Sequence, residues 1–436
     1  MLLLGVGTRP TSAGSPSGPG YLRAGRDSEA FPPLGPDSPL SPPPTVLPSP
    51  HATAEMATNT RPAIATCTAL VLAAVAVGVL ATLSPSTRSI SHHADAQSAQ
   101  TQARSEALGS GHSGGLSILE GYSALISFHG GSSSEDVNEV YVYHLASGKL
   151  HDTLMKKHAV KQGHARNLRG LEYDPDRNVL YVAQAYKHDG CIYTLDLNKK
   201  EPEAYRLYEQ DGELHTYGLA LANKRRWLLT SNQDTGDVSL HDSRDGKVLA
   251  YPYVTLSHKD ASPRGIAVDE ERRVMFLAER YAYKVSCWSL DFDDATKRPK
   301  EKLFEIDVDH PIGVTYDAKS RRLFVASDAD DKEQANVRRF HIDRVDKAPK
   351  IEAVYKPHKD DELAHPTGIE LVYLRRSDEE VFGGEGGAVV LVLGQKKRAL
   401  YAFDALTTKY LGKVIEDFPD DPEDLLVLRN DLAEVL

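Results

Sequence analysis

From residue 116 onward, short apolar runs alternate with charged, glycine-containing segments, and one kind of run recurs. It starts with a glycine followed by alternating apolar residues, at Gly170, Gly218, Gly265, Gly313 and Gly368, with spacings of 48, 47, 48 and 55 residues. Each copy precedes a second apolar run such as VLYVAQ, a third such as CIYTLDL and a weaker fourth such as KVLAYPYV. Runs rich in Val, Tyr, Phe and Leu between such turns predict β-strands. Four strands every ~48 residues predict the blades of an all-β propeller.

The two ends of this repeat region complement one another. The first unit, residues 124–154, matches the second, third and fourth strands but lacks a clear first. Residues 422–428 (PEDLLVL) match a first strand, and little comes after them. We therefore expect 422–428 to lie beside 124–128 and complete that blade, which gives six blades and removes exposed sheet edges. The alternative is seven blades, with Gly121–Phe128 as an inner strand of its own.

The repeats resemble the NHL and surface-layer (lactonase-type) propeller superfamily over about residues 116–430. The resemblance rests on the Pro-x-Gly start with its apolar run and Asp, the R-x-L-F-V-A second strand, and the third strand ending in Asp. It implies a six-bladed propeller. It does not imply one activity, because this fold hosts scaffolds, lactonases, lyases and ligand binders.

In propellers of this kind, the loops that precede the first strand and follow the second share one face, around the central channel. The residues just before the repeat glycines, together with the matching residue of 422–428, are therefore candidates for the channel mouth: Arg169, Tyr217, Arg264, Ile312, Thr367 and Glu423. Relatives that resemble gluconolactonases hold a divalent metal there, and amidating-lyase relatives hold zinc through His. Two Arg and one carboxylate do not fit either site, because guanidinium groups repel a cation.

Three histidines, His215, His310 and His365, occupy equivalent positions two residues earlier in three blades, with Asn167, Ser262 and Asp421 in the others. Three imidazoles on one rim are weak candidates for a transition-metal site. The alternative is that each His closes its own loop through backbone hydrogen bonds.

The ends of the second strands add Gln184, Asn232, Glu279 and Asp328 to the same face, either as site residues or as turn residues. Arg169 and Arg264, with Tyr217, predict a site for a small anion, since Arg binds carboxylates in a fork. The alternative is that these Arg pair with Glu172 or Glu279. The expected ligand-binding set is Arg169, Tyr217, Asn232, Arg264, Glu279 and Glu423.

The chain before residue 116 has a different character. Twelve of the 25 prolines fall in residues 1–50, and we interpret 1–60 as a disordered tail. Residues 64–83 form a 20-residue run without a charge. Such a run spans a bilayer core of ~30 Å as a helix. Residues 61–84 are therefore a transmembrane signal-anchor, a cleaved signal peptide with translation starting at Met56, or a buried Ala-rich helix. Residues 85–115 are polar and predict a flexible stalk, and 116–436 form the propeller.

Charge and cysteine content narrow the functional classes. Residues 1–115 carry six Arg and six acids, so the net charge of -11 belongs entirely to residues 116–436. An acidic domain repels phosphate backbones and argues against nucleic acid as a partner. The three cysteines lack the spacing of a zinc site, and Cys191 and Cys287, two blades apart, are expected to be buried thiols.

These observations favour a membrane-tethered or secreted propeller, lumenal or extracellular, that binds a small anion or a protein without catalysis and without a cofactor. The alternative is a lactonase- or esterase-like hydrolase with its site at the channel mouth. No G-x-S-x-G motif or other catalytic set can be identified.

Overall fold

The computed structural model describes residues 116–130, 136–156, 165–186, 189–209, 215–258, 261–299, 302–329, 335–374 and 387–430. All of these residues belong to the propeller. The predicted tail, hydrophobic span and stalk lie outside them. Within the described residues, no helix has the length and apolar character needed to cross a bilayer.

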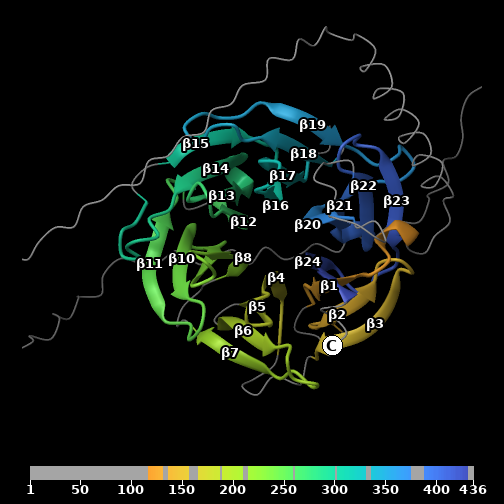
Figure 1. Ribbon diagram of the computed structural model, residues 1–436, viewed down its shortest axis with the longest axis horizontal. Helices are drawn as coiled ribbons and strands as arrows, with labels where there is room; N and C mark the ends of the chain where they lie inside the picture. Colours follow the sequence, from red (N-terminus) through yellow and green to blue (C-terminus); the bar gives the residue numbers. More distant parts are fainter. Residues whose placement is uncertain are drawn as a thin grey trace, which may run out of the picture. The chain divides into compact units, whose positions relative to one another are not determined.

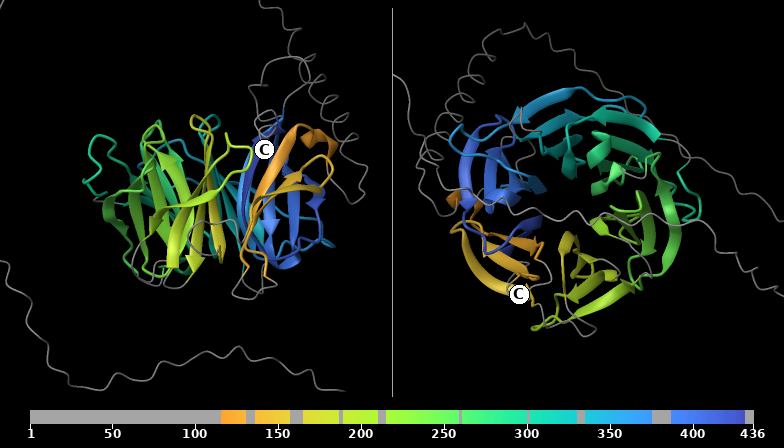
Figure 2. Two further views of the ribbon diagram at one scale, coloured as in Figure 1. Left: turned by 90° about the horizontal axis from the view of Figure 1, so that it is seen from below. Right: turned by 180° about the vertical axis from the view of Figure 1, so that it is seen from behind.

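Six four-stranded antiparallel sheets stand around a central axis as the blades of a ring (Figure 1). Their inner strands lie at the axis and their outer strands at the rim, as two further views show (Figure 2). From the axis outward, the first three blades have these strands. Blade 1 is β24 (Pro422–Arg429), β1 (Tyr122–Phe128), β2 (Val140–His144) and β3 (Lys149–Met155). Blade 2 is β4 (Leu168–Asp174), β5 (Val179–Tyr186), β6 (Asp189–Asp196) and β7 (Ala204–Glu209). Blade 3 is β8 (Thr216–Ala222), β9 (Trp227–Asn232), β10 (Asp237–Asp242) and β11 (Val248–Thr255).

The other three blades repeat this order. Blade 4 is β12 (Pro263–Asp269), β13 (Val274–Glu279), β14 (Lys284–Ser289) and β15 (Lys302–Asp307). Blade 5 is β16 (Pro311–Asp317), β17 (Arg322–Ser327), β18 (Asn336–His341) and β19 (Ile351–Tyr355). Blade 6 is β20 (Pro366–Tyr373), β21 (Ala388–Gly394), β22 (Ala399–Asp404) and β23 (Tyr410–Ile415). The all-β, six-bladed prediction is confirmed.

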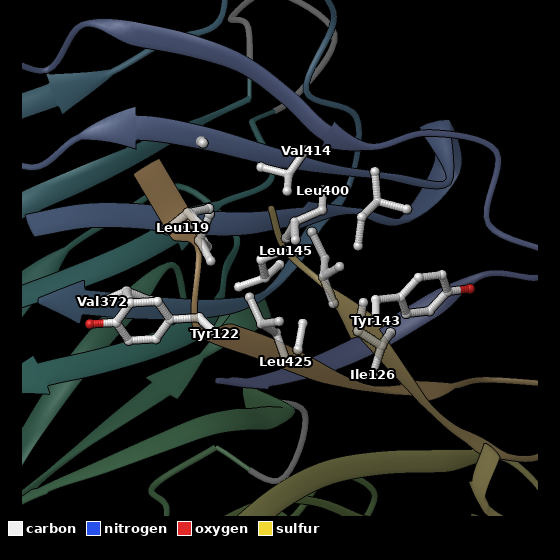
Figure 3. Packing of buried hydrophobic residues seen from close by; sticks show 14 of the residues in the cluster. Leu119, Tyr122, Ile126, Tyr143, Leu145, Val372, Leu400, Val414 and Leu425 are labelled. Carbon is white, nitrogen blue, oxygen red and sulfur yellow. The ribbon is translucent and has the colours of Figure 1, made fainter. Parts of the chain in front are cut away.

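Blade 1 closes the ring as the sequence predicts. Strand β24 pairs antiparallel with β1, with Ala124 opposite Val427 and Ile126 opposite Leu425. Figure 3 shows the apolar side chains behind this junction: Tyr122 and Leu425 from blade 1 lie beside Val372 of blade 6. Closure therefore completes the sheet of blade 1 and also buries a hydrophobic core between the first and last blades.

The repeat glycines allow the inner strands to approach each other closely. A Cβ on Gly313 would lie 1.9 Å from the carbonyl oxygen of Thr367 in the next blade, and one on Gly218 would lie 2.5 Å from that of Arg264. No side chain fits such a space, so glycine at this position is a steric requirement. At the sixth position the closing strand has Asp424 instead.

We predict that deletion of residues 420–436 abolishes the cooperative melt or lowers the melting temperature by about 10 °C or more, because it removes an inner strand and exposes unpaired edges. Thermal melts of the purified variants measure this. Deletion of 431–436 alone, or of 1–84, is the control and should leave the melt of the propeller nearly unchanged. A native-like melt after deletion of 420–436 would show that closure by β24 is dispensable.

Candidate functional site

One face of the ring carries the loops predicted to form the mouth, and a repeated hydrogen bond shapes them. In every blade, the carbonyl three residues before the inner-strand glycine, or before Asp424, accepts a backbone N–H from the end of the second strand. Examples are Gln233 N to His215 O at 2.8 Å and Gln395 N to His365 O at 3.1 Å. In four blades this residue has a positive φ: 47° at Asn167, 53° at Ser262, 36° at His310 and 53° at His365. Asn and His tolerate that conformation better than most residues, which accounts for part of the pattern seen in the sequence.

The structure brings four predicted residues together as a buried cluster over the channel, with Gln395 as a fifth member. We call Arg169, Tyr217, Arg264, Gln395 and Glu423 the mouth cluster. Glu423 accepts hydrogen bonds from Arg169 Nη1 at 2.7 Å, from the Tyr217 hydroxyl at 2.9 Å and from Gln395 Nε2 at 2.6 Å. Every member is less than a tenth exposed. Thus the partner of Arg169 is Glu423, and not Glu172 or Glu279 as in the alternative interpretation.

Electrostatics keep Glu423 ionised in this buried place. Burial by itself raises the pKa of the carboxyl group, but the charges of Arg169 and Arg264 and the Tyr217 hydrogen bond outweigh burial and hold the pKa below its ordinary value. Nearby, burial and the charge of Arg169 lower the pKa of His129 to about 4. His129 is therefore neutral near pH 7, and Arg169 is the cation that balances Glu423.

Arg264 is the charged member of the cluster that forms no direct ion pair. Its guanidinium carbon lies 4.4 Å from the centre of the Tyr217 ring, a cation–π contact, and the Arg169 guanidinium carbon lies 5.7 Å from the same centre. Among the described residues no carboxylate forms an ion pair with Arg264, and its buried Nε has no hydrogen-bond partner. Two guanidinium groups and one carboxylate leave the cluster with one positive charge.

Several buried polar atoms at the mouth have no hydrogen-bond partner among the described residues. Residues at equivalent positions of blades 2, 3 and 4 carry buried atoms that have no hydrogen-bond partner among the described residues: Asn167 Oδ1, Arg169 Nε, His215 Nε2, Ser262 Oγ and Arg264 Nε. Buried polar groups are normally hydrogen-bonded. A group of such atoms at the mouth is therefore where a polar ligand or ordered water would be held.

Two predicted site residues point elsewhere. Asn232 donates to Asp237 Oδ1 at 2.6 Å and to Ser239 Oγ at 2.7 Å, inside its own blade. Glu279 is buried, and burial raises the pKa of its carboxyl group, although the hydrogen bond from Ser286 acts in the opposite direction. Neither side chain forms a hydrogen bond or an ion pair with the mouth cluster.

The three rim histidines each lie beside a separate carboxylate. His215 Nδ1 is 3.2 Å from Asp234 Oδ2, His310 Nδ1 is 3.2 Å from Asp309 Oδ1, and His365 Nδ1 is 2.6 Å from Asp328 Oδ2. Over the parts of the chain that the structure describes, no three His, Cys, Asp or Glu side chains are arranged to hold a metal ion. Asp328 also pairs with Arg280 at 3.1 Å, so it connects blades 4, 5 and 6 across the rim.

Beneath the mouth cluster lies a cavity of about 220 Å³ along the axis, lined by the six inner strands. Besides Glu423, three acids line it, Glu172, Glu370 and Asp424, and no described Lys, Arg or His does. Burial raises the pKa values of these three channel acids, to about 7 for Glu172, about 8 for Glu370 and about 7 for Asp424, and mutual repulsion adds to the shift of Glu370. As a group, these acids were not predicted from the sequence. The sequence contained one indication of the channel acids. Glu172 and Glu370 lie two residues after their repeat glycines, where the other repeats have Ala220, Ala267 or Thr315.

Serine bridges at the mouth were also missed. Ser127 Oγ accepts from Asp424 N at 3.1 Å and donates to Arg169 O at 2.6 Å, and Ser231 Oγ likewise links Gly218 N to Arg264 O. Each bridge ties the inner strand of one blade to that of the next. They place the backbone of both mouth Arg residues.

No protein-family profile matches this chain, and no curated protein matches it. Several solved structures do resemble it. A chain of a nidogen/laminin complex is 14% identical, with 70% of this chain and 98% of that chain covered and a TM-score of 0.48. The periplasmic gluconolactonase of Pseudomonas aeruginosa is 15% identical, with coverages of 70% and 99% and a TM-score of 0.46. A functionally unknown protein of Desulfotomaculum acetoxidans is 9% identical, with coverages of 71% and 99% and a TM-score of 0.46. At these identities the likeness concerns the fold alone.

We predict that the propeller loses stability as the pH rises, because of the channel acids. The folded-state pKa of Glu370 is about 8, against an ordinary value of 4.5, so the native chain holds more protons than the unfolded chain between those values. The stability that the protonated Glu370 carboxyl group contributes is complete below about pH 4.5 and is lost as the pH rises toward 8. Glu370→Gln should make the decline shallower and raise stability at pH 8.5 by roughly 2 kcal/mol.

Urea melts of both proteins from pH 5 to 8.5 measure this effect. Glu362→Gln, at an exposed side chain that pairs with Lys397 and does not line the cavity, is the control and should follow the native curve. A Glu370→Gln variant that is less stable than the native protein at pH 8.5 would contradict the assignment of a destabilising buried charge.

Proposed function

We propose that the propeller is a binding module whose mouth cluster takes an anionic, carboxylate-bearing group. The observation that carries the proposal is that the Arg264 guanidinium, buried beside Tyr217, forms no ion pair with a described carboxylate, while Glu423 accepts hydrogen bonds from Arg169, Tyr217 and Gln395. A buried cation without a counter-ion is costly. A bound anion would remove that cost.

The surrounding atoms support the same chemistry. Arg264 Nε, Arg169 Nε and Ser262 Oγ are donors without partners, while Asn167 Oδ1 can accept from a hydroxyl or amide of the ligand. The expected ligand therefore carries one negative group and at least one polar hydrogen. Charge-assisted hydrogen bonds of this kind contribute about 1.5–3 kcal/mol each.

Outside the described residues, the uncharged run 64–83 supports the further proposal that the module is tethered to a membrane or secreted, with the propeller lumenal or extracellular. Extraction of cell membranes with alkaline carbonate tests the tether. A chain that remains in the membrane pellet agrees with an anchor, release after cleavage before the stalk agrees with secretion, and an uncleaved chain in the soluble fraction contradicts both.

A hydrolase is the second candidate, and one contact favours it. His365 is 2.6 Å from Asp328 through Nδ1, an arrangement that orients an imidazole so that Nε2 can act as a general base. In an ester or lactone hydrolysis, this nitrogen would take a proton from water as the oxygen attacks the carbonyl carbon, then return it to the departing alkoxide. Loss of ester or lactone turnover in His365→Gln would establish this alternative.

We predict that small carboxylates stabilise the native protein against heat and that Arg264→Ala abolishes the effect, with a loss of roughly ten- to hundredfold in affinity. Glu423→Gln should have the opposite effect on binding. It leaves two guanidinium groups unbalanced, so it lowers stability by about 3–5 kcal/mol without added anion and regains stability in acetate more than the native protein does.

Thermal-shift titrations with acetate and a panel of small carboxylates measure both effects. Arg398→Ala, at an exposed Arg of the same face, is the control and should leave anion binding unchanged. The proposal is wrong if no carboxylate stabilises the native chain and acetate does not rescue Glu423→Gln. The cluster would then only stabilise the fold and would not bind a ligand.

A further inference from the structure

The outer strand of blade 5, β19, offers an unpaired sheet edge with an unusual apolar surface. It lies at the rim of the ring, and no described strand pairs with its outer side (Figure 1). Ile351 is 50% exposed and Val354 is 38% exposed. Among the described outer strands only β11 has as many exposed large apolar residues, and Pro252 interrupts its edge. The edge of β19 contains neither Pro nor Gly.

The single acidic residue of β19 does not place a free negative charge at this edge. Glu352 turns across the blade onto Arg322, with nitrogen–oxygen distances of 2.7 and 2.8 Å, and onto Arg339 at 3.1 Å. Its charge is therefore neutralised by blade 5 itself. The edge that remains consists of backbone and the side chains of Ile351 and Val354.

Four lysines flank the strand in a domain whose net charge is -11. Lys347, Lys350, Lys356 and Lys359 are all exposed, and none forms an ion pair with any residue that the structure describes. The acids that come next in the chain, Asp360 and Asp361, are engaged by His358 and Lys413. The edge of β19 thus carries an uncompensated positive charge at each end.

We propose that the outer edge of β19 docks an extended acidic segment of a partner protein, which adds to blade 5 as a fifth strand. An unpaired edge supplies main-chain hydrogen bonds to an added strand, and flanking side chains set the selectivity. Lys350 and Lys356 are six residues apart, about 20 Å along a strand. The partner segment therefore has acids at a similar spacing on either side of an alternating apolar stretch. A second copy of β19 is disfavoured, because antiparallel self-pairing about Ala353 would place Lys350 opposite Lys356.

The test is fluorescence anisotropy on the full-length chain with a labelled peptide of sequence EEVTVTVEE. We expect saturable binding that weakens at least tenfold in the double variant Lys350→Glu, Lys356→Glu, and also in 0.5 M salt. The same peptide with proline at its centre keeps the charge but cannot extend the sheet, and should bind at least tenfold more weakly. A lysine-flanked version, KKVTVTVKK, should not bind.

The matched control is Lys149→Glu, Lys156→Glu, which reverses the exposed lysines at the two ends of β3 in blade 1. Thermal melts should show that both double variants fold, since all four side chains are exposed. Equal binding of the proline peptide, equal loss in the blade 1 control, or preference for anionic phosphatidylserine vesicles over the peptide would each overturn the proposal. The proposal is also overturned if the peptide does not bind and the Lys350→Glu, Lys356→Glu variant self-associates. That result would mean that the lysines prevent copies of the chain from pairing at this edge.

Discussion

The distance between neighbouring inner strands at the axis controls the rest of this structure. Five glycines let each inner strand rest on the backbone of the next, and a methyl group at Gly313 would already overlap a carbonyl of blade 6. Close-packed strands leave only a narrow axial space, so polar side chains immediately before the glycines meet one another at the channel mouth. The mouth cluster is the result.

The sixth inner strand, β24, has no glycine at the equivalent position, and two acidic residues there link the closure of the ring to the mouth. Asp424 takes the place of a glycine, and its carboxylate accepts the N–H of Leu171 at 2.7 Å across the junction with blade 2. The adjacent Glu423 holds Arg169, Tyr217 and Gln395. One short segment thereby joins ring closure, the mouth and the acidic channel. A change in the ionisation of either acid affects both the stability of the ring and the charge presented at the mouth.

Blade number, strand order and the closing strand could all be predicted from the repeat, because each rests on local periodicity and on matching one segment with another. The positions of Arg169, Tyr217, Arg264 and Glu423 could be predicted for the same reason. Their partners could not, since which carboxylate meets which guanidinium depends on rotamers and on loops from other blades, such as the one that brings Gln395. Asn232 and Glu279 illustrate the limit. Their backbone reaches the predicted face, but the alternation of a strand turns their side chains into the blade.

The junction of β1 and β24 also has a consequence for synthesis. Phe128 and Pro422, opposite each other in the closing pair, are 294 positions apart in the chain (422 minus 128). At about 5–20 residues per second, a ribosome takes roughly 15–60 s to make the intervening chain. During that time blades 2 to 6 can assemble in order, while the three strands of blade 1 wait with an open inner edge. Nascent chains of this protein therefore have a built-in interval in which one sheet edge must be shielded from other chains.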